Sequence, residues 1–319
     1  MPYLNLRFML GQLWSRCLKV VPKLGTVVVK LGVCLCIYLC LGSLFLPIAI
    51  ADSIPESIQS AASANLSRSS NPPDIQRILD RGTLKVVLLN QENSPFFMMH
   101  GGALEGLDIT LAKAIATQLG VKLELMPTAT TFDEAVDTVY KLDADLALSK
   151  VSRTLKRARL VRFSQPYLRM RQGLLVNRVQ ITQQTNGRDM TEVIRDLTGT
   201  IGVIQGSSYV GFAKQKFPKT KVIEFTDWAD LVNAVMQGKV LAAYRDELEV
   251  KKVIRTQPGS ALQFQTIALT DTEDAIAAVL PWDSEHLLAF VNQYLDSNKI
   301  NYTADTVLED YADYFKKSG

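Results

Sequence analysis

Short runs of β-branched and apolar residues alternate with helical periodicity over most of this 319-residue chain. Residues 83–90 read as a buried strand, residues 104–119 read as a helix with an apolar residue at every fourth position from Leu107, and residues 121–126 read as another strand. A strand–helix–strand order of this kind predicts a parallel sheet covered by helices. A second unit of the same kind is expected at residues 200–246. The chain therefore belongs to the α/β class.

Two such units, followed by closing helices at residues 283–297 and 304–316, predict two lobes joined by a hinge. Each lobe is expected to hold a mixed, mostly parallel sheet flanked by helices. The expected domain covers residues 74–319, with lobe 1 at about 74–172 and 268–319 and lobe 2 at about 173–267. Within lobe 1, a helix at residues 132–142 is expected to begin after Thr131 as N-cap, because Glu134 follows three residues later.

The first 51 residues have the composition of an export segment. They contain five basic residues and no acidic one, residues 31–50 are an apolar run, and the run ends in the small-x-small pattern Ala49-Ile50-Ala51. Residues 1–51 are either a signal peptide cleaved after Ala51 or an uncleaved anchor whose residues 31–50 span the membrane. Both alternatives place the remainder outside the cytoplasm, in the periplasm or its equivalent. Residues 52–73 are rich in Ser, Ala, Asn and Pro and are expected to form a flexible tether.

Several classes of function are disfavoured by composition. All four cysteines lie in the export segment, and the only histidines are His100 and His286, so a metal site, a thiol nucleophile and Ser-His catalysis are disfavoured. Neither a catalytic residue nor a cofactor is expected. Beyond residue 51 the chain has slightly more acidic than basic residues, which gives no reason to expect nucleic-acid binding.

The stretch at residues 145–167, DLALSKVSRTLKRARLVRFSQPY, is the most informative motif. It contains Thr154-x-x-Arg157 and then Phe163-Ser164-x-Pro166-Tyr167, and it resembles the family-3 extracellular solute-binding proteins. These are polar amino acid receptors of ATP-driven importers. The resemblance, which covers about residues 74–300, implies the two-lobed periplasmic-binding-protein type II fold. It also implies an amino acid ligand, an ABC permease as partner, a monomer and a binding protein that is not an enzyme.

The resemblance also implies a ligand site. The guanidinium of Arg157 would hold the ligand carboxylate through two parallel hydrogen bonds, and Asp246 from lobe 2 would accept the ligand ammonium. The remaining ligand-binding residues implied are Ser149, Ser152, Ser208, Phe132 and Asn93. The residues also admit other interpretations: Arg157 as a surface cation, Asp246 as the cap of the following helix, the serines as turn hydroxyls, and Phe132 as core.

The sequence departs from the family pattern at positions that bear on the ligand. Lys150 stands where the family has a small hydroxyl residue, and it either forms a salt bridge with a neighbour or reaches an acidic ligand side chain. Asn90 stands where receptors for basic amino acids have an acid, which disfavours lysine or arginine as ligand. Two rival functions remain open: a membrane-tethered ligand sensor, and a cyclohexadienyl-type dehydratase that uses Glu92 for proton transfer.

Overall fold

The computed structural model describes residues 71–256 and 258–316. The predicted export segment and residues 52–70 of the predicted tether lie outside them. The described residues belong to a compact unit, Ser70–Gly319, whose first helix, α4 (Pro73–Arg81), begins at the last residue of the predicted tether. Among the described residues, no helix has both the length and the apolar character needed to span a membrane.

Lobe 1 is built on a five-stranded sheet with the order β4-β1-β5-β12-β6. Strand β1 pairs in parallel with β4 and β5, and β12 pairs antiparallel with β5 and β6. The strands are β1 (Thr83–Leu89), β4 (Lys122–Ala129), β5 (Leu146–Ala147), β6 (Arg162–Phe163) and β12 (Val279–Leu280). A separate hairpin joins β2 (Met98–His100) to β3 (Ala103–Glu105).

Helices cover both faces of this sheet because the side chains of β1 alternate between them. Val86 and Leu88 pack in one cluster with α4, α5 (Leu107–Leu119) and α13 (Glu285–Ser297). Val87 packs in another cluster with α6 (Phe132–Tyr140). The side chain of Thr131 accepts a hydrogen bond from the Glu134 N–H at the start of α6, which confirms the predicted N-cap.

Lobe 2 is built on a second mixed sheet with the order β11-β7-β10-β8-β9, to which β13 adds beside β7. Its strands are β7 (Leu168–Asn177), β8 (Gly199–Ile204), β9 (Thr220–Phe225), β10 (Ala242–Asp246), β11 (Phe264–Ile276) and β13 (Tyr302–Thr303). Helix α10 (Tyr209–Lys216) packs on one face, and α11 (Trp228–Met236) and α12 (Glu247–Thr256) pack on the other. The remaining elements of this lobe are α8 (Arg178–Thr185), α9 (Met190–Arg195) and a 3-10 turn at Pro258–Leu262.

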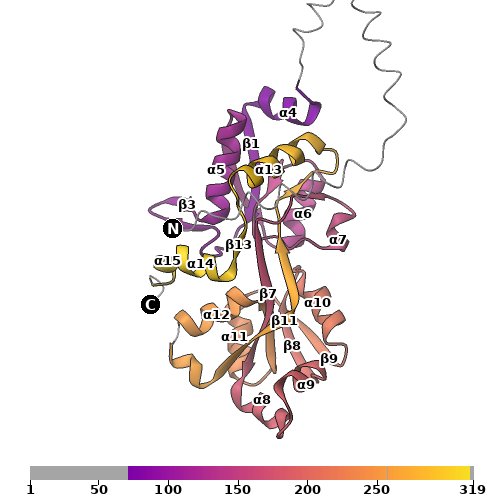
Figure 1. Cartoon of the computed structure of the whole chain (residues 1–319), viewed down its shortest axis with the longest axis vertical. Helices are drawn as coiled ribbons and strands as arrows, with labels where there is room; N and C mark the ends of the chain where they lie inside the picture. The colour runs from indigo at the N-terminus through magenta and orange to yellow at the C-terminus, as the bar shows by residue number, and fades with distance from the viewer. Residues whose placement is uncertain (1–70, 257, 317–319) are drawn as a thin grey trace, which may run out of the picture. The chain divides into compact units, whose positions relative to one another are not determined.

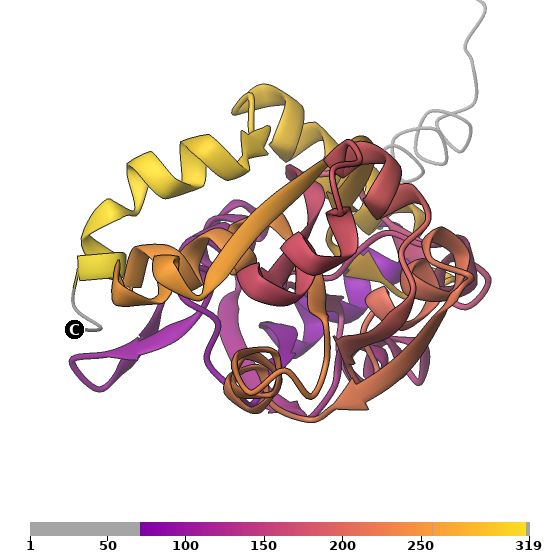
Figure 2. The same cartoon turned by 90° about the horizontal axis from the view of Figure 1, so that it is seen from below.

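Strands β7 and β11 carry the chain between the lobes (Figure 1). Leu168 and Met170 at the start of β7 pack in the core of lobe 1, whereas Leu174 and Val176 pack in the core of lobe 2. The two strands pair antiparallel, with an irregularity between Leu269 and Asp274. At the C-terminus, α14 (Ala304–Asp310) and α15 (Ala312–Lys316) lie against α12 (Figure 2). The architecture confirms the predicted α/β class.

Candidate functional site between the lobes

Arg157 is buried between the lobes and is not a surface cation. It lies on the short helix α7 (Leu155–Ala158), and its side chain is 4% exposed. Its Nε and Nη2 donate hydrogen bonds to Asp133 Oδ1 at 3.0 and 2.8 Å. Nη1 donates to the Ser152 carbonyl oxygen at 3.1 Å, and Nη2 also donates to the Gly206 carbonyl oxygen of lobe 2 at 3.3 Å. The guanidinium that the sequence assigns to a ligand carboxylate is therefore engaged by the protein itself.

Asp133, at the start of α6, takes the place that a ligand carboxylate would have on Arg157. Burial raises the pKa of Asp133, but the charge and hydrogen bonds of Arg157, helped by Lys156, outweigh it and hold the pKa below its usual range. The backbone N–H of Asp133 also donates to the Gly206 carbonyl oxygen at 3.1 Å. Asp133 and Arg157 together thus fasten lobe 1 to the turn that precedes α10.

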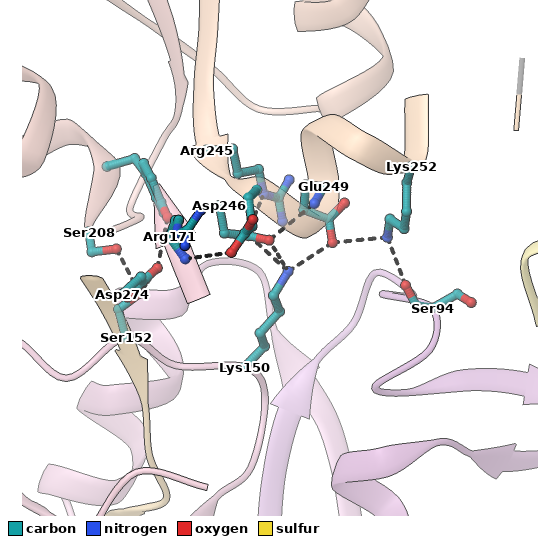
Figure 3. A network of polar contacts seen from close by, with 12 residues as sticks. Ser94, Lys150, Ser152, Arg171, Ser208, Arg245, Asp246, Glu249, Lys252 and Asp274 are labelled. Atoms are coloured by element: carbon teal, nitrogen blue, oxygen red, sulfur yellow. Dashed lines mark hydrogen bonds and ion pairs between the residues drawn. The ribbon is translucent and has the colours of Figure 1, made fainter. Parts of the chain in front are cut away.

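Lys150 occupies the position facing the predicted ammonium acceptor. Its Nζ donates to both carboxylate oxygens of Asp246 at 3.0 Å and to Glu249 Oε1 at 2.9 Å, as Figure 3 shows. Only 3% of the Lys150 side chain is exposed. Asp246 Oδ1 also accepts the Glu249 N–H at 3.1 Å and so caps α12. The structure therefore confirms two alternatives from the sequence, the Lys150 salt bridge and the Asp246 cap.

The ion pairs continue from Glu249 to Lys252, whose Nζ donates to Glu249 Oε1 at 2.9 Å and to the Ser94 carbonyl oxygen of lobe 1 at 2.7 Å. Burial raises the pKa of Glu249, but the charges of Lys150 and then Lys252 outweigh it and hold the pKa well below its usual range. Burial lowers the pKa of Lys252. A row of charged groups therefore crosses from one lobe to the other (Figure 3).

The predicted serines have different surroundings. Ser208 Oγ donates across the lobes to Ser152 Oγ at 2.9 Å, and Ser152 Oγ donates to Asp274 Oδ2 at 3.1 Å. Ser149 is fully buried, and its Oγ accepts the Leu89 N–H at 2.9 Å, so this hydroxyl closes the end of β1. The structure thus brings Ser152 and Ser208 together with Arg157. The Ser149 hydroxyl instead takes part in a hydrogen bond within lobe 1.

Asp274, on β11, belongs to the site and was not foreseen from the sequence. Tyr209 Oη donates to its Oδ2 at 2.8 Å, while its Oδ1 has no hydrogen-bond partner among the described residues. Burial, with the nearby charge of Asp246, raises the pKa of Asp274 to about 6. No local motif marks this residue, because Ser152 and Asp274 meet only when β11 returns to lobe 1.

Two cavities adjoin this junction. The smaller, 20 Å³ in volume, lies among Lys150, Ser152, Ser208, Asp246 and Asp274. The larger measures 1110 Å³ and is walled by both lobes. Its walls include Gln91, Asn93 and Phe132 from lobe 1 and Trp228, Arg245 and Phe264 from lobe 2. Phe132 and Arg245 line both cavities, so the two spaces meet at these side chains.

This arrangement is suited to holding a molecule between two lobes. The 1110 Å³ of the larger cavity lie just above the roughly 300–1,000 Å³ of ordinary small-molecule sites, so the cavity has room for a whole small molecule. Glu92, the residue named for proton transfer, lines the larger cavity and accepts the Met99 N–H at 3.1 Å. Within residues 71–256 and 258–316 there is no cluster of His, Cys, Asp and Glu that could hold a metal ion.

The model of the bacterial extracellular solute-binding proteins, family 3, matches residues 85–314 of the chain. An amino acid ABC transporter substrate-binding protein from Streptococcus pneumoniae, solved bound to L-arginine, is 28% identical with a TM-score of 0.60. That match covers 76% of this chain and 98% of the solved one. An ancestral amino acid-binding protein, a precursor of cyclohexadienyl dehydratase, is 27% identical with a TM-score of 0.59, covering 74% and 98%.

The matched relatives among curated proteins are named as enzymes, not as substrate-binding proteins. Membrane-bound lytic murein transglycosylase F from Pseudomonas putida (strain W619) is 28% identical over 247 residues. The match covers 75% of this chain and 48% of that protein, so the chain spans about half the length of this relative. The protein of the same name from Aliivibrio fischeri is 26% identical over 238 residues, covering 71% and 45%.

These matches confirm the resemblance to family 3 and the two-lobed fold. They contradict the expectation that the chain is not an enzyme, because the matched curated relatives bear the name of an enzyme, and one solved neighbour is named as the precursor of another. The ligand roles of Arg157, Asp246 and the other site residues stay predictions.

Proposed function

Because the chain belongs to the family-3 bacterial extracellular solute-binding proteins, we propose that it is a receptor that closes its two lobes on a small molecule of the amino-acid class. The proposed site is the 1110 Å³ cavity, and this cavity is the observation that supports the proposal most strongly, since both lobes contribute walls to it. We further propose that the receptor works outside the cytoplasm and presents its ligand to the permease of an ABC importer.

The chemistry of the cavity walls supports a ligand with both apolar and polar parts. Phe132, Trp228 and Phe264 supply apolar surface, and Arg245 and Asn93 supply a cation and an amide. Other polar and charged side chains also line the cavity, among them Gln91, Glu92 and Lys252. Polar groups placed on an apolar wall fix the orientation of a bound ligand. The named ligand of the solved neighbour from Streptococcus pneumoniae, L-arginine, supports the amino-acid class.

Thermal unfolding in the presence of candidate ligands tests the proposal. The panel holds the twenty amino acids and their N-acetyl derivatives. A ligand at one hundred times its Kd stabilises the folded protein by about 2.7 kcal/mol, which raises the Tm of a domain of this size by roughly 5–11 °C. We expect at least one member to do so.

A matched pair of tryptophan variants locates the site. Trp228→Ala removes a wall of the cavity and is expected to weaken binding by about 30-fold. Trp282→Ala changes the same residue type at a side chain that is 55% exposed and does not line the cavity, so binding should be unchanged. The proposal fails if no panel member binds, and the cavity is the wrong site if Trp228→Ala binds as wild type does.

A membrane-tethered sensor is a second candidate, favoured by the name of the curated relatives, which are membrane-bound. It rests on an uncleaved export segment, which lies outside the described residues. Mass spectrometry of the protein isolated from whole cells gives its first residue. Met1 supports the tethered sensor, whereas Asp52 supports the free receptor.

A further inference from the structure

The two anchors expected to grip a free amino acid are already filled by side chains of the protein. Asp133 lies on Arg157 as a carboxylate would, and the Lys150 ammonium lies on Asp246 as a ligand ammonium would. The space left beside Lys150 and Asp246 is 20 Å³, which is room for about one water molecule. A molecule with a free α-ammonium would have to displace Lys150 from both Asp246 and Glu249.

Arg245 offers a cation whose hydrogen-bond donors are not used by the described residues. Its side chain is 12% exposed, and its guanidinium carbon lies 5.2 Å from the centre of the Trp228 ring. Its Nε forms an ion pair with Asp246 Oδ2 at 3.8 Å, which is beyond hydrogen-bond distance, and the guanidinium donates no hydrogen bond to any residue in the described part of the chain. The five N–H groups of a nearly buried guanidinium need acceptors, and a carboxylate matches its planar fork.

Asn93 offers the complementary acceptor in the same cavity. The residue is 7% exposed, and its Oδ1 is buried without a hydrogen-bond partner among the described residues. A buried carbonyl oxygen without a donor is costly. Rotation of the Asn93 amide by half a turn brings this oxygen to the cavity side, where it can accept an N–H group of a ligand. The cavity therefore presents a donor fork at Arg245, an amide at Asn93 and apolar surface at Trp228 and Phe132, with the charged side chains of Glu92, Glu249 and Lys252 also on its wall.

We propose that the ligand of this cavity is an amino acid whose α-amine is blocked as an amide, with its carboxylate on Arg245 and its amide N–H on Asn93 Oδ1. The Lys150 ammonium, held on Asp246, excludes free amines. The proposal rests on the proposed function and names the ligand class of the same site. The apolar walls favour an apolar side chain or acyl group in the ligand.

Isothermal titration of the full chain with paired ligands tests this proposal. The pair is each free amino acid and its N-acetyl derivative, and we expect the derivative to bind at least ten-fold more tightly. Arg245→Gln should weaken that binding by about ten-fold or more, because a charge-assisted pair is lost. Arg169→Gln is the matched control, since Arg169 is 45% exposed, pairs with Glu273 and does not line the cavity.

An ester analogue tests the Asn93 contact separately. Replacing the amide N–H of the best N-acetyl ligand with an ester oxygen should weaken binding to the wild type. Asn93→Ala should bind the amide and the ester equally. Lys150→Ser should gain affinity for the free amino acid, and if this variant does not fold, the Arg245 and Asn93 variants still decide the question.

The outcomes separate the two proposals. If a free amino acid binds at least as tightly as its N-acetyl form and Arg245→Gln binds like wild type, the ligand class proposed here is wrong while the receptor function stands. If neither series binds, both proposals are wrong. A preference for N-acetyl ligands that survives Arg245→Gln places their carboxylate elsewhere and also overturns the assignment.

Discussion

Replacing Lys150 by methionine tests whether the buried ammonium holds the lobes together. The change keeps a long side chain but removes the charge that lies 3.0 Å from Asp246 and 2.9 Å from Glu249, where all three side chains are 3–4% exposed. Removing one partner of a buried ion pair leaves the others uncompensated and costs about 3–5 kcal/mol. At roughly 2–4 °C per kcal/mol for a domain of this size, the Tm of Lys150→Met should fall by about 6–20 °C.

The chain supplies a matched control at Lys156. This lysine also pairs with a carboxylate, Asp133, at 3.1 Å, but its side chain is 81% exposed. Lys156→Met should therefore change the free energy of unfolding by about 1 kcal/mol or less. Chemical denaturation of both variants and of Asp246→Asn, alone and combined with Lys150→Met, gives the Lys150–Asp246 coupling, expected at about 0.5–3 kcal/mol. Equal stability losses in the two methionine variants, or no coupling, would refute the reasoning.

Two further changes probe the junction. Burial raises the Asp274 pKa from 3.8 to about 6, so the folded state binds the proton more tightly than the unfolded state. Stability from this group is present below pH 4 and is lost as pH rises to about 6. Asp274→Asn should therefore abolish about 3 kcal/mol of the loss in unfolding free energy that the wild type shows as pH rises. Urea denaturation between pH 4 and 8 measures this loss. The same pH profile in the variant and the wild type would contradict the raised pKa of Asp274. Gly206→Ala would place a Cβ 2.7 Å from Thr131 Cβ of lobe 1, at a φ of +64°. The Gly206→Ala variant should therefore keep the lobes apart and enlarge the radius of gyration in small-angle scattering. Gly211→Ala is the control, because open space surrounds that position, and it should leave the radius of gyration unchanged. Identical scattering from both variants would argue against closure at the contact between Gly206 and Thr131.

Local signals in the sequence were sufficient for most of lobe 1. The helix predicted after Thr131 begins there because the cap and Glu134 are neighbours in sequence. Strand β7 was not predicted from the sequence because its pattern of buried and exposed residues changes along its length. Its first half alternates between buried and exposed residues, whereas its second half is buried up to Val176, because β7 is an internal strand of the sheet of lobe 2. A strand that serves two lobes has no single periodicity to detect.

Part of the site was predictable as a set of residues, but Asp274 and Arg245 were not foreseen and the contacts were not predictable. Arg157, Ser152, Ser208 and Asp246 do lie together between the lobes, as the family resemblance implied, whereas Ser149 does not join them and the ligand roles of all five stay predictions. That Lys150 would take Asp246 depends on a pairing across 96 positions, which no local pattern encodes. The departure of Lys150 from the family pattern was the one signal available, and it pointed to a salt bridge without naming the partner.

The side chains of Asp133 and Lys150 already occupy Arg157 and Asp246, and this affects how the two lobes close. In a receptor whose ligand bridges the lobes, contacts that exist only in the closed state drive the conformational change. Here Lys150, Lys252 and Arg157 already make such contacts across the lobes. The protein's own contacts between the lobes therefore already favour the closed state, and a ligand in the larger cavity would stabilise that state further.

A crystal structure of the protein with its bound N-acyl amino acid tests the central claim most directly. We predict that Lys150 Nζ stays within hydrogen-bond distance of Asp246 while the ligand carboxylate lies on Arg245. A ligand ammonium on Asp246, with Lys150 turned away and the ligand carboxylate on Arg157, would contradict the account.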